Sequence, residues 1–431
     1  MQRVCAAGLT LATIIFVRRA VLWILAACAH PVPPRADAPD ELPRDAIRRY
    51  TIWLGGAQIG TAIESETWSV SGVILRRTEA LRFLRGDAQV ALTTTIEIHA
   101  DPGLVPSSVR WSERGGLAHR GEAIHDARGW HVRLDGSTTT LRAEALPAEL
   151  VPLVLRRDGH FAGAVFLPAR GFVGGSGRID PVAADEPRRL VARLRLDAGP
   201  VVEATIDLGA DGAPVRVVDG EGVIAMRATE AQAAAGFPLV DLIAATSVPL
   251  TGTRVPGHRL ALIGDLALPA VPGQAARTGD ASLELELGPA LPGDLPPGEP
   301  GPDRGRDITA LVARVRDRIA PDLGSGATSA RDAAAATAGD CTTFALAYAA
   351  LATRTGIPTR VITGLRIDGD RLIRHRWAVS WTGRAWIAVD AAFGAAPAGG
   401  DLIGLAIHDA DDAGLIAGEA ALTQVRAAAW L

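Results

Sequence analysis

Lysine and asparagine are both absent from the sequence, so its 44 basic residues are all arginine. Without asparagine the chain has no acceptor for N-glycosylation and no Asn that could orient a catalytic histidine. Without lysine it has no side-chain amine for an isopeptide bond. The formal net charge is only −4 and forms no basic stripe, which argues against a nucleic-acid partner.

Cysteine is nearly absent as well, and one of the three cysteines ends an N-terminal targeting pattern. Arg18 and Arg19 precede a short apolar run, and Leu-Ala-Ala then leads to Cys28. This ending resembles a bacterial lipobox, and the resemblance implies a signal peptide over residues 1–28 with lipid on Cys28. Ala29 in the next position then favours an anchor on the periplasmic face of the outer membrane. The alternative is a single uncleaved anchor helix.

The chain is long enough for two or three domains. Residues 29–46 are rich in Pro, Ala and Asp and predict a flexible tether. Apolar and polar residues then alternate in short runs between turn signals, which predicts a mostly antiparallel β domain, a half-barrel or a sandwich, over residues 47–288. Residues 289–306 are a Pro/Gly stretch and predict a linker to a second domain, residues 307–431.

The second domain has a different periodicity. Apolar residues lie on one helical face from Ile308 to Ile319, and an alanine-rich helix is expected from Cys341 to Arg354, ending before Gly356. Three strands are expected after it, at residues 359–365, 373–381 and 385–393. Helices followed by an antiparallel sheet predict an α+β domain.

Three residues of this domain form a candidate catalytic set. Cys341 starts a helix, where the partial positive charge favours a thiolate, and Asp340 before it is expected to cap that helix. A hairpin turning at residues 382–383 would pair His375 directly with Asp390 across two strands, so that the carboxylate orients the imidazole. The adjacent Gly339 would let a substrate approach closely. No Cys, His or Asp pair has the close spacing of a zinc site.

These residues lie in segments that resemble a known family. The segments "GDCTTFALAYAALATRTGIPTRVITGL", "HRWAVSW" and "AWIAVDAAFG" resemble the transglutaminase-like fold of the papain-type cysteine superfamily. The resemblance covers about residues 305–431 and implies a Cys-His-Asp triad made of Cys341, His375 and Asp390, acting without a cofactor on a peptide or protein amide. Trp377 and Trp386 are expected to be core residues or walls of the substrate pocket.

Three functions remain open at this stage. The first is an extracytoplasmic thiol acyl-transfer enzyme, either an amide hydrolase or a transamidase. The second is a non-catalytic module of the cell envelope that binds a peptide or wall fragment, because a fold does not fix a function. The third is a mainly structural protein in which the β domain carries a partner interaction.

Overall fold

The computed structural model describes residues 43–115, 118–183, 185–197, 201–219, 222–253, 259–264, 266–279, 282–327 and 329–431. The predicted signal peptide, Cys28 and most of the predicted tether lie outside these residues. No described helix is long and apolar enough to cross a membrane. The chain is mostly β, and its described residues form two compact units: the β unit, residues 43–83 and 89–240, and the α+β unit, residues 84–88 and 241–431.

The β unit is built on one 15-stranded sheet whose order is β8-β7-β6-β5-β4-β3-β2-β1-β15-β14-β13-β12-β11-β10-β9, although the adjoining ends of β3 and β4 belong to the segment 84–88 of the α+β unit. Its strands are β1 Ala46–Leu54, β2 Ala57–Ser69, β3 Gly72–Arg85, β4 Ala88–Ala100, β5 Pro106–Arg114, β6 His119–Asp126, β7 Gly129–Leu134, β8 Ser137–Leu141, β9 Leu146–Pro147, β10 Phe161–Leu167, β11 Val173–Pro181, β12 Arg189–Leu196, β13 Val201–Leu208, β14 Pro214–Asp219 and β15 Val223–Ala228. Its helices are η1 Ala148–Leu150, α2 Val151–Asp158, η2 Pro168–Arg170 and α3 Glu230–Ala234.

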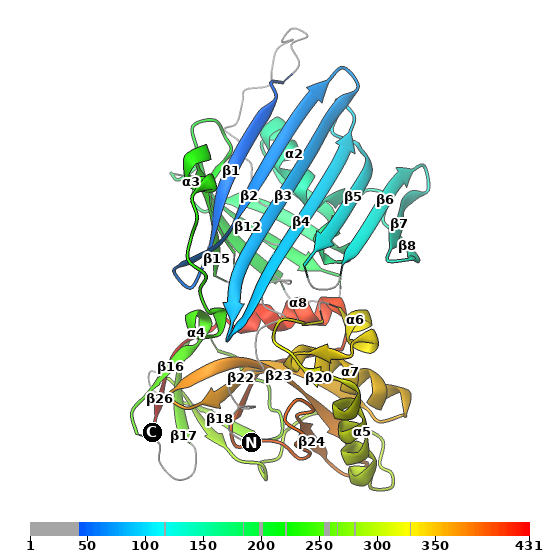
Figure 1. The fold of residues 1–431 in the computed structure, drawn as a ribbon, viewed down its shortest axis with the longest axis vertical. Helices are drawn as coiled ribbons and strands as arrows, with labels where there is room; N and C mark the ends of the chain where they lie inside the picture. The colour runs from blue at the N-terminus through cyan, green and yellow to red at the C-terminus, as the bar shows by residue number, and fades with distance from the viewer. Residues whose placement is uncertain are drawn as a thin grey trace. The chain divides into compact units, whose positions relative to one another are not determined.

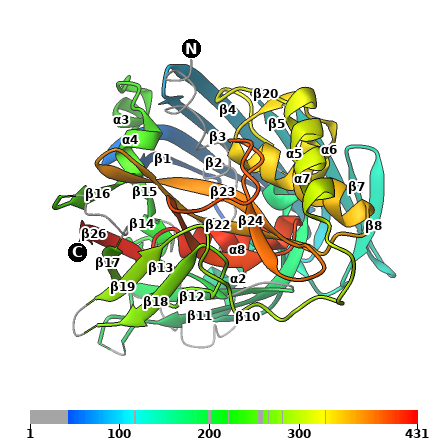
Figure 2. The same ribbon diagram turned by 90° about the horizontal axis from the view of Figure 1, so that it is seen from below.

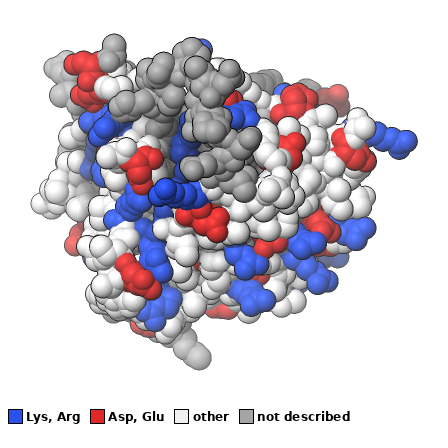
Figure 3. Space-filling model, turned by 90° about the horizontal axis from the view of Figure 1, so that it is seen from above, with Lys and Arg blue, Asp and Glu red and all other residues white. Residues whose placement is uncertain are grey.

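Alternation of apolar and polar residues produces this sheet. Along β3 and β4, buried and more exposed residues alternate, so one face of each strand packs inward. Neighbouring strands are antiparallel except β9 and β10, and Figure 1 shows β1 to β8 as successive neighbours. On the outer face arginines pair with acidic residues, as Arg76 does with Glu97. Figure 3, a view from above, shows basic and acidic side chains interspersed on the surface that it displays.

Several charged side chains lie inside the β unit rather than on its surface. Arg48 bonds both Glu64 and Glu66, and Arg156 of α2 also binds Glu66 at 2.7 Å. Glu149 lies nearby in η1, and burial raises the pKa of its carboxyl to about 7, although the charge of Arg77 opposes this rise. Glu149 is therefore a buried acid that titrates near neutral pH.

The α+β unit contains a nine-stranded sheet. Its order is β18-β19-β17-β26-β16-β23-β22-β25, and β24 pairs with β23. The strands are β16 Val248–Thr251, β17 Arg259–Gly264, β18 Gln274–Thr278, β19 Leu283–Leu287, β22 Thr359–Asp368, β23 Arg371–Trp381, β24 Trp386–Val389, β25 Leu402–His408 and β26 Val425–Trp430, with β20 Ala320–Pro321 and β21 Ala338–Gly339 forming a separate pair. The helices are α4 Leu242–Thr246, α5 Gly305–Arg318, α6 Ala330–Ala335, α7 Cys341–Arg354 and α8 Asp412–Ala421.

The helices of this unit cover the sheet in two groups. Helix α7 packs against β23, β22, α5 and α6, whereas α8 packs against β25 and β22. Figure 2 shows α5, α6 and α7 gathered together and α8 apart from them. The predicted helix over residues 341–354 is present with those bounds, and Gly356 beyond it has the left-handed backbone of a helix stop, with φ of +74°.

The division into units differs from the boundary that the sequence suggested. The Pro/Gly stretch contains no helix or strand up to residue 304, and it lies within the α+β unit rather than between the two units. The strands β16 to β19, which precede this stretch, pair with β26 and β23 in the sheet of the α+β unit. These pairings join residues more than 100 positions apart, and local periodicity carries no information about them.

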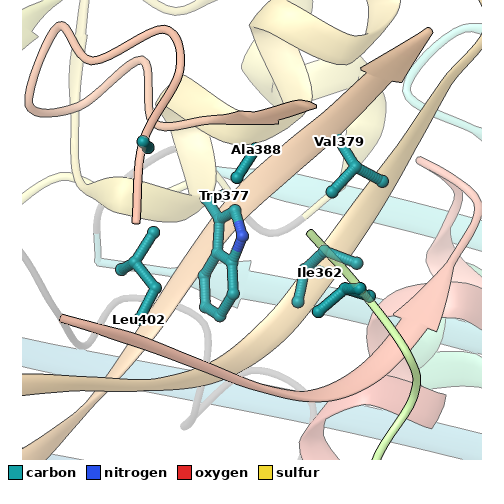
Figure 4. Packing of buried hydrophobic residues seen from close by; sticks show 7 residues of the cluster. Ile362, Trp377, Val379, Ala388 and Leu402 are labelled. Carbon is teal, nitrogen blue, oxygen red and sulfur yellow. The ribbon is translucent and has the colours of Figure 1, made fainter. Parts of the chain in front are cut away.

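The core of the α+β unit is centred on β22 and β23. Trp377 packs there with six other buried residues, of which Ile362, Val379, Ala388 and Leu402 are labelled in Figure 4. Gly364 lies between Trp377 and the backbone of β25, where a Cβ atom would meet the carbonyl oxygen of Ile403 at 2.0 Å. Strand β23, which carries the candidate histidine, is thus held against β22 by tight packing around Trp377.

Candidate active site

Cys341 is the first residue of α7 and is buried, with 4% of its surface exposed. Asp340 is the N-cap, as the sequence predicted: its Oδ1 accepts hydrogen bonds from the backbone N–H groups of Thr342 at 3.1 Å and Thr343 at 3.2 Å. Gly339 before it packs tightly against the same turn, because a Cβ atom at Gly339 would lie 2.3 Å from Oγ1 of Thr343.

The electrostatic environment of Cys341 differs from the sequence-based expectation. Burial raises the pKa of the thiol strongly, and the charges of Asp340 and Asp390 raise it further. The charge of Arg376 and a hydrogen bond from the Arg376 backbone N–H oppose this rise. The capping carboxylate thus offsets the positive end of the helix, and Cys341 rests as a neutral thiol that needs a base to become a nucleophile.

His375 and Asp390 form the second part of the candidate site. Nε2 of His375 and Oδ2 of Asp390 are 2.7 Å apart, and both side chains are buried. Oδ1 of Asp390 also accepts hydrogen bonds from the backbone N–H groups of Ala392 and Phe393. The carboxylate is therefore fixed by the turn that follows β24, and it holds the imidazole through Nε2.

The predicted register of this hairpin is wrong by two residues. Trp381 pairs with Trp386 and Ala378 with Val389, so the strand pairing places Trp377, not His375, opposite position 390. The turn uses the four residues 382–385, closed by the hydrogen bond from the Thr382 N–H to the Ala385 carbonyl. His375 and Asp390 still meet, because they are diagonal rather than direct neighbours on the same face.

Two aromatic rings pack against the imidazole of His375. The ring of Trp377 stacks on that of His375 at 6.0 Å, and Phe393 contacts it edge-on at 5.6 Å. Nδ1 of His375 is buried and has no hydrogen-bond partner within the described residues. In the same residues there is no hydrogen bond between Cys341 and His375, although the Arg376 backbone N–H next to His375 reaches the thiol. Nδ1 is thus the ring nitrogen left available for a proton.

The two candidate pocket residues are placed differently. Trp377 is a core residue, 1% exposed, that also covers His375. Trp386 is partly buried against that core, and its Nε1 donates to the carbonyl oxygen of Pro296 at 2.8 Å. Trp386 thereby fastens the Pro/Gly stretch to the sheet.

Sequence reasoning missed a buried polar network on the opposite face of β23. Arg376 donates to Thr342, Thr363 and Glu419, and Thr363 also bonds Nε2 of His408. Burial lowers the pKa of His408 to about 3, so this imidazole is neutral. In the sequence, Arg376 stands in a strand that also contains Arg371 and Arg374, so nothing local marked it as the buried residue of this network.

The pockets found among the described residues lie in the β unit, away from the three candidate residues. One hollow of about 1230 Å³ is lined by β-unit residues including Arg110, Trp111 and Arg133, with none of the three candidate residues. In the described part of the chain, no three His, Cys, Asp or Glu side chains gather as metal ligands.

Comparison with known proteins agrees with this local arrangement. Residues 299–391 match the transglutaminase-like superfamily, and the matched region contains Cys341, His375 and Asp390. No curated protein and no solved structure matches the chain. The chain therefore carries a transglutaminase-like domain at residues 299–391.

Proposed function

Since residues 299–391 form a transglutaminase-like domain, we propose that this protein is a thiol acyl-transfer enzyme with Cys341 as its nucleophile. The observation that carries the proposal is the 2.7 Å bond between His375 Nε2 and Asp390 Oδ2, which leaves Nδ1 of the same ring without a partner among the described residues. This combination supplies an oriented base in the same domain as a thiol that burial keeps protonated.

The chemistry divides between the three side chains. Nδ1 of His375 takes the thiol proton as Sγ of Cys341 attacks the carbonyl carbon of an amide, and Asp390 stabilises the imidazolium that forms. The imidazolium then protonates the departing amine, leaving a thioester on Cys341. Water, or an amine, attacks this thioester, gives its proton to His375, and the thiol is restored.

Hydrolysis is the preferred outcome of the second half-reaction. No feature of the described residues marks a site for a second, amine substrate. Because the sequence contains no lysine, the chain cannot serve as its own side-chain amine donor. Incubation with a glutamine-containing peptide and a small primary amine should release ammonia without incorporating the amine. Covalent multimers of the protein incubated alone would contradict this reasoning.

The test of the triad uses p-nitrophenyl acetate as an acyl donor and intact mass to detect the acyl-enzyme. Wild type should form a single acyl adduct at Cys341, whereas Cys341→Ala and His375→Ala should form none. His131→Ala, which removes an exposed histidine of the β unit, is the matched control and should behave as wild type. Normal acylation of His375→Ala would overturn the assignment.

A non-catalytic module is the second candidate, favoured by the burial of Cys341. The nucleophile is only 4% exposed, so acylation requires local movement around the start of α7. If the thiol resists iodoacetamide at every pH below 10 while the folded protein binds peptides, the binding module becomes the better description.

The N-terminal pattern adds a location to this proposal. Lipid on Cys28 would hold the enzyme on the periplasmic face of the outer membrane, facing the peptide material of the cell envelope. Cys28→Ser should release the protein from membranes or leave an uncleaved precursor. Unchanged membrane retention of Cys28→Ser would support an anchor helix instead.

A further inference from the structure

Arg376 is a buried cation that joins three elements around the start of α7. Its side chain is 2% exposed, and each of its nitrogens has a different partner. Nε donates to Thr363 of β22 at 2.9 Å, and one terminal nitrogen donates to Thr342 of α7 at 3.0 Å. The other terminal nitrogen forms an ion pair with Glu419 of α8 at 2.7 Å.

The position of Arg376 in the chain connects it to both reacting groups. It directly follows His375, and Thr342, which its guanidinium binds, directly follows Cys341. Its backbone N–H also makes a hydrogen bond to the thiol. Arg376 therefore reaches the nucleophile twice, once through its own backbone and once through the neighbouring hydroxyl.

The charges around Cys341 explain why a cation matters there. Asp340 caps the N-terminus of α7, and Asp390 binds His375. The negative charges of both carboxylates disfavour a thiolate at Cys341. Arg376 opposes them, as does Arg85 of the segment Leu84–Ala88, which also lies within the electrostatic reach of Cys341. Glu419 balances part of the Arg376 charge, while His408 beyond Thr363 is neutral.

We infer that Arg376 is a positioning residue of the Cys341 site, which fixes the first turn of α7 through Thr342 and stabilises the thiolate with its charge and its backbone N–H. The inference rests on the proposed function. If Arg376 had only a structural role, its ion pair with Glu419 would stabilise the fold, and removing that pair would leave the ionisation of the Cys341 thiol unchanged.

The test follows alkylation of Cys341 by iodoacetamide from pH 5 to pH 10, read on the peptide that contains this residue. Arg376→Gln should move the profile to higher pH and slow alkylation about tenfold at neutral pH, the effect of one pKa unit. Arg376→Lys retains the charge and should recover most of the rate. Arg371→Gln, an exposed arginine of the same strand, should match wild type.

Glu419→Gln provides a change of opposite sign. It removes the balancing carboxylate, so the full charge of Arg376 should speed alkylation, whereas a structural disturbance would slow it. This variant also decides the matter if Arg376→Gln does not fold. A profile unchanged or slower in Glu419→Gln, or a folded Arg376→Gln with the wild-type profile, would overturn the inference.

These readouts separate the inference from the proposed function. Alkylation needs no substrate, so a shifted profile in Arg376→Gln supports the inference even if no acyl-enzyme forms. Conversely, if wild type is acylated normally and the alkylation profile of Arg376→Gln is unchanged, the proposed function stands and the role inferred for Arg376 is wrong.

Discussion

Replacement of Asp390 by asparagine tests the orientation of the histidine with almost no change in shape. The Asn oxygen can still accept from the backbone N–H groups of Ala392 and Phe393, which hold the turn. Its amide nitrogen, however, would face Nε2 of His375 as a donor. The ring would then keep its proton on Nδ1, and Nδ1 could no longer take a proton from Cys341.

The size of this effect follows from the bond that is lost. The 2.7 Å contact is a buried, charge-assisted hydrogen bond, worth about 1.5–3 kcal/mol. At about 1.4 kcal/mol per factor of ten, acylation of Cys341 by p-nitrophenyl acetate should fall about 10- to 150-fold. The tautomer change can increase this loss toward about 10⁴-fold.

The assay measures the rate of acyl-enzyme formation at pH 7, with circular dichroism melts as the control for folding. Asp390→Ala should lose the turn contacts as well, and therefore should melt at a lower temperature than Asp390→Asn. If Asp390→Asn is acylated as fast as wild type and melts at the same temperature, the carboxylate does not orient His375 and the reasoning fails.

Two further predictions concern stability. The folded-state pKa of Glu149, about 7, lies above its ordinary value of 4.5, so the folded protein binds more protons and loses stability as pH rises between these values. Glu149→Gln should remove this loss, so the free energy of unfolding measured with urea should rise by about 3 kcal/mol at pH 8 and by almost nothing near pH 4.5. An equal gain at both pH values would contradict the raised pKa of Glu149. Tyr348→Phe removes the buried 2.8 Å bond to Ser380, and urea unfolding at pH 7 should show a loss of about 1 kcal/mol, with the alkylation profile of Cys341 unchanged; a shifted profile would tie this bond to the site.

The local elements of the site could be predicted from the sequence. Helix α7, its Asp340 cap and strands β22 and β23 follow from periodicity, capping and turn residues, all of which are local signals. The contact between His375 and Asp390 was expected, but from the wrong register, since Thr382 closes a four-residue turn instead of a two-residue one.

The parts that could not be predicted depend on distant partners. The acid that binds Arg376 is Glu419, 43 residues further along the chain, and nothing local connects the two. Similarly, the thiol pKa of Cys341 depends on burial by the surrounding elements, which outweighs the helix end that the sequence makes visible. Tertiary packing decides both, and a single sequence does not display it.

The sheet that carries β23 has a consequence for how this chain is synthesised and cut. Its outer strands come from residues 248–287, ahead of the Pro/Gly stretch, and β26 from residues 425–430 lies between β17 and β16. During translation β16 and β17 cannot complete their hydrogen bonds until β26 has been synthesised, so this sheet assembles late and through non-local contacts. After folding, cleavage of the Pro/Gly stretch by a protease should give two fragments that remain associated through the backbone hydrogen bonds of β16 and β17 with β26. The fragments should separate only under denaturing conditions.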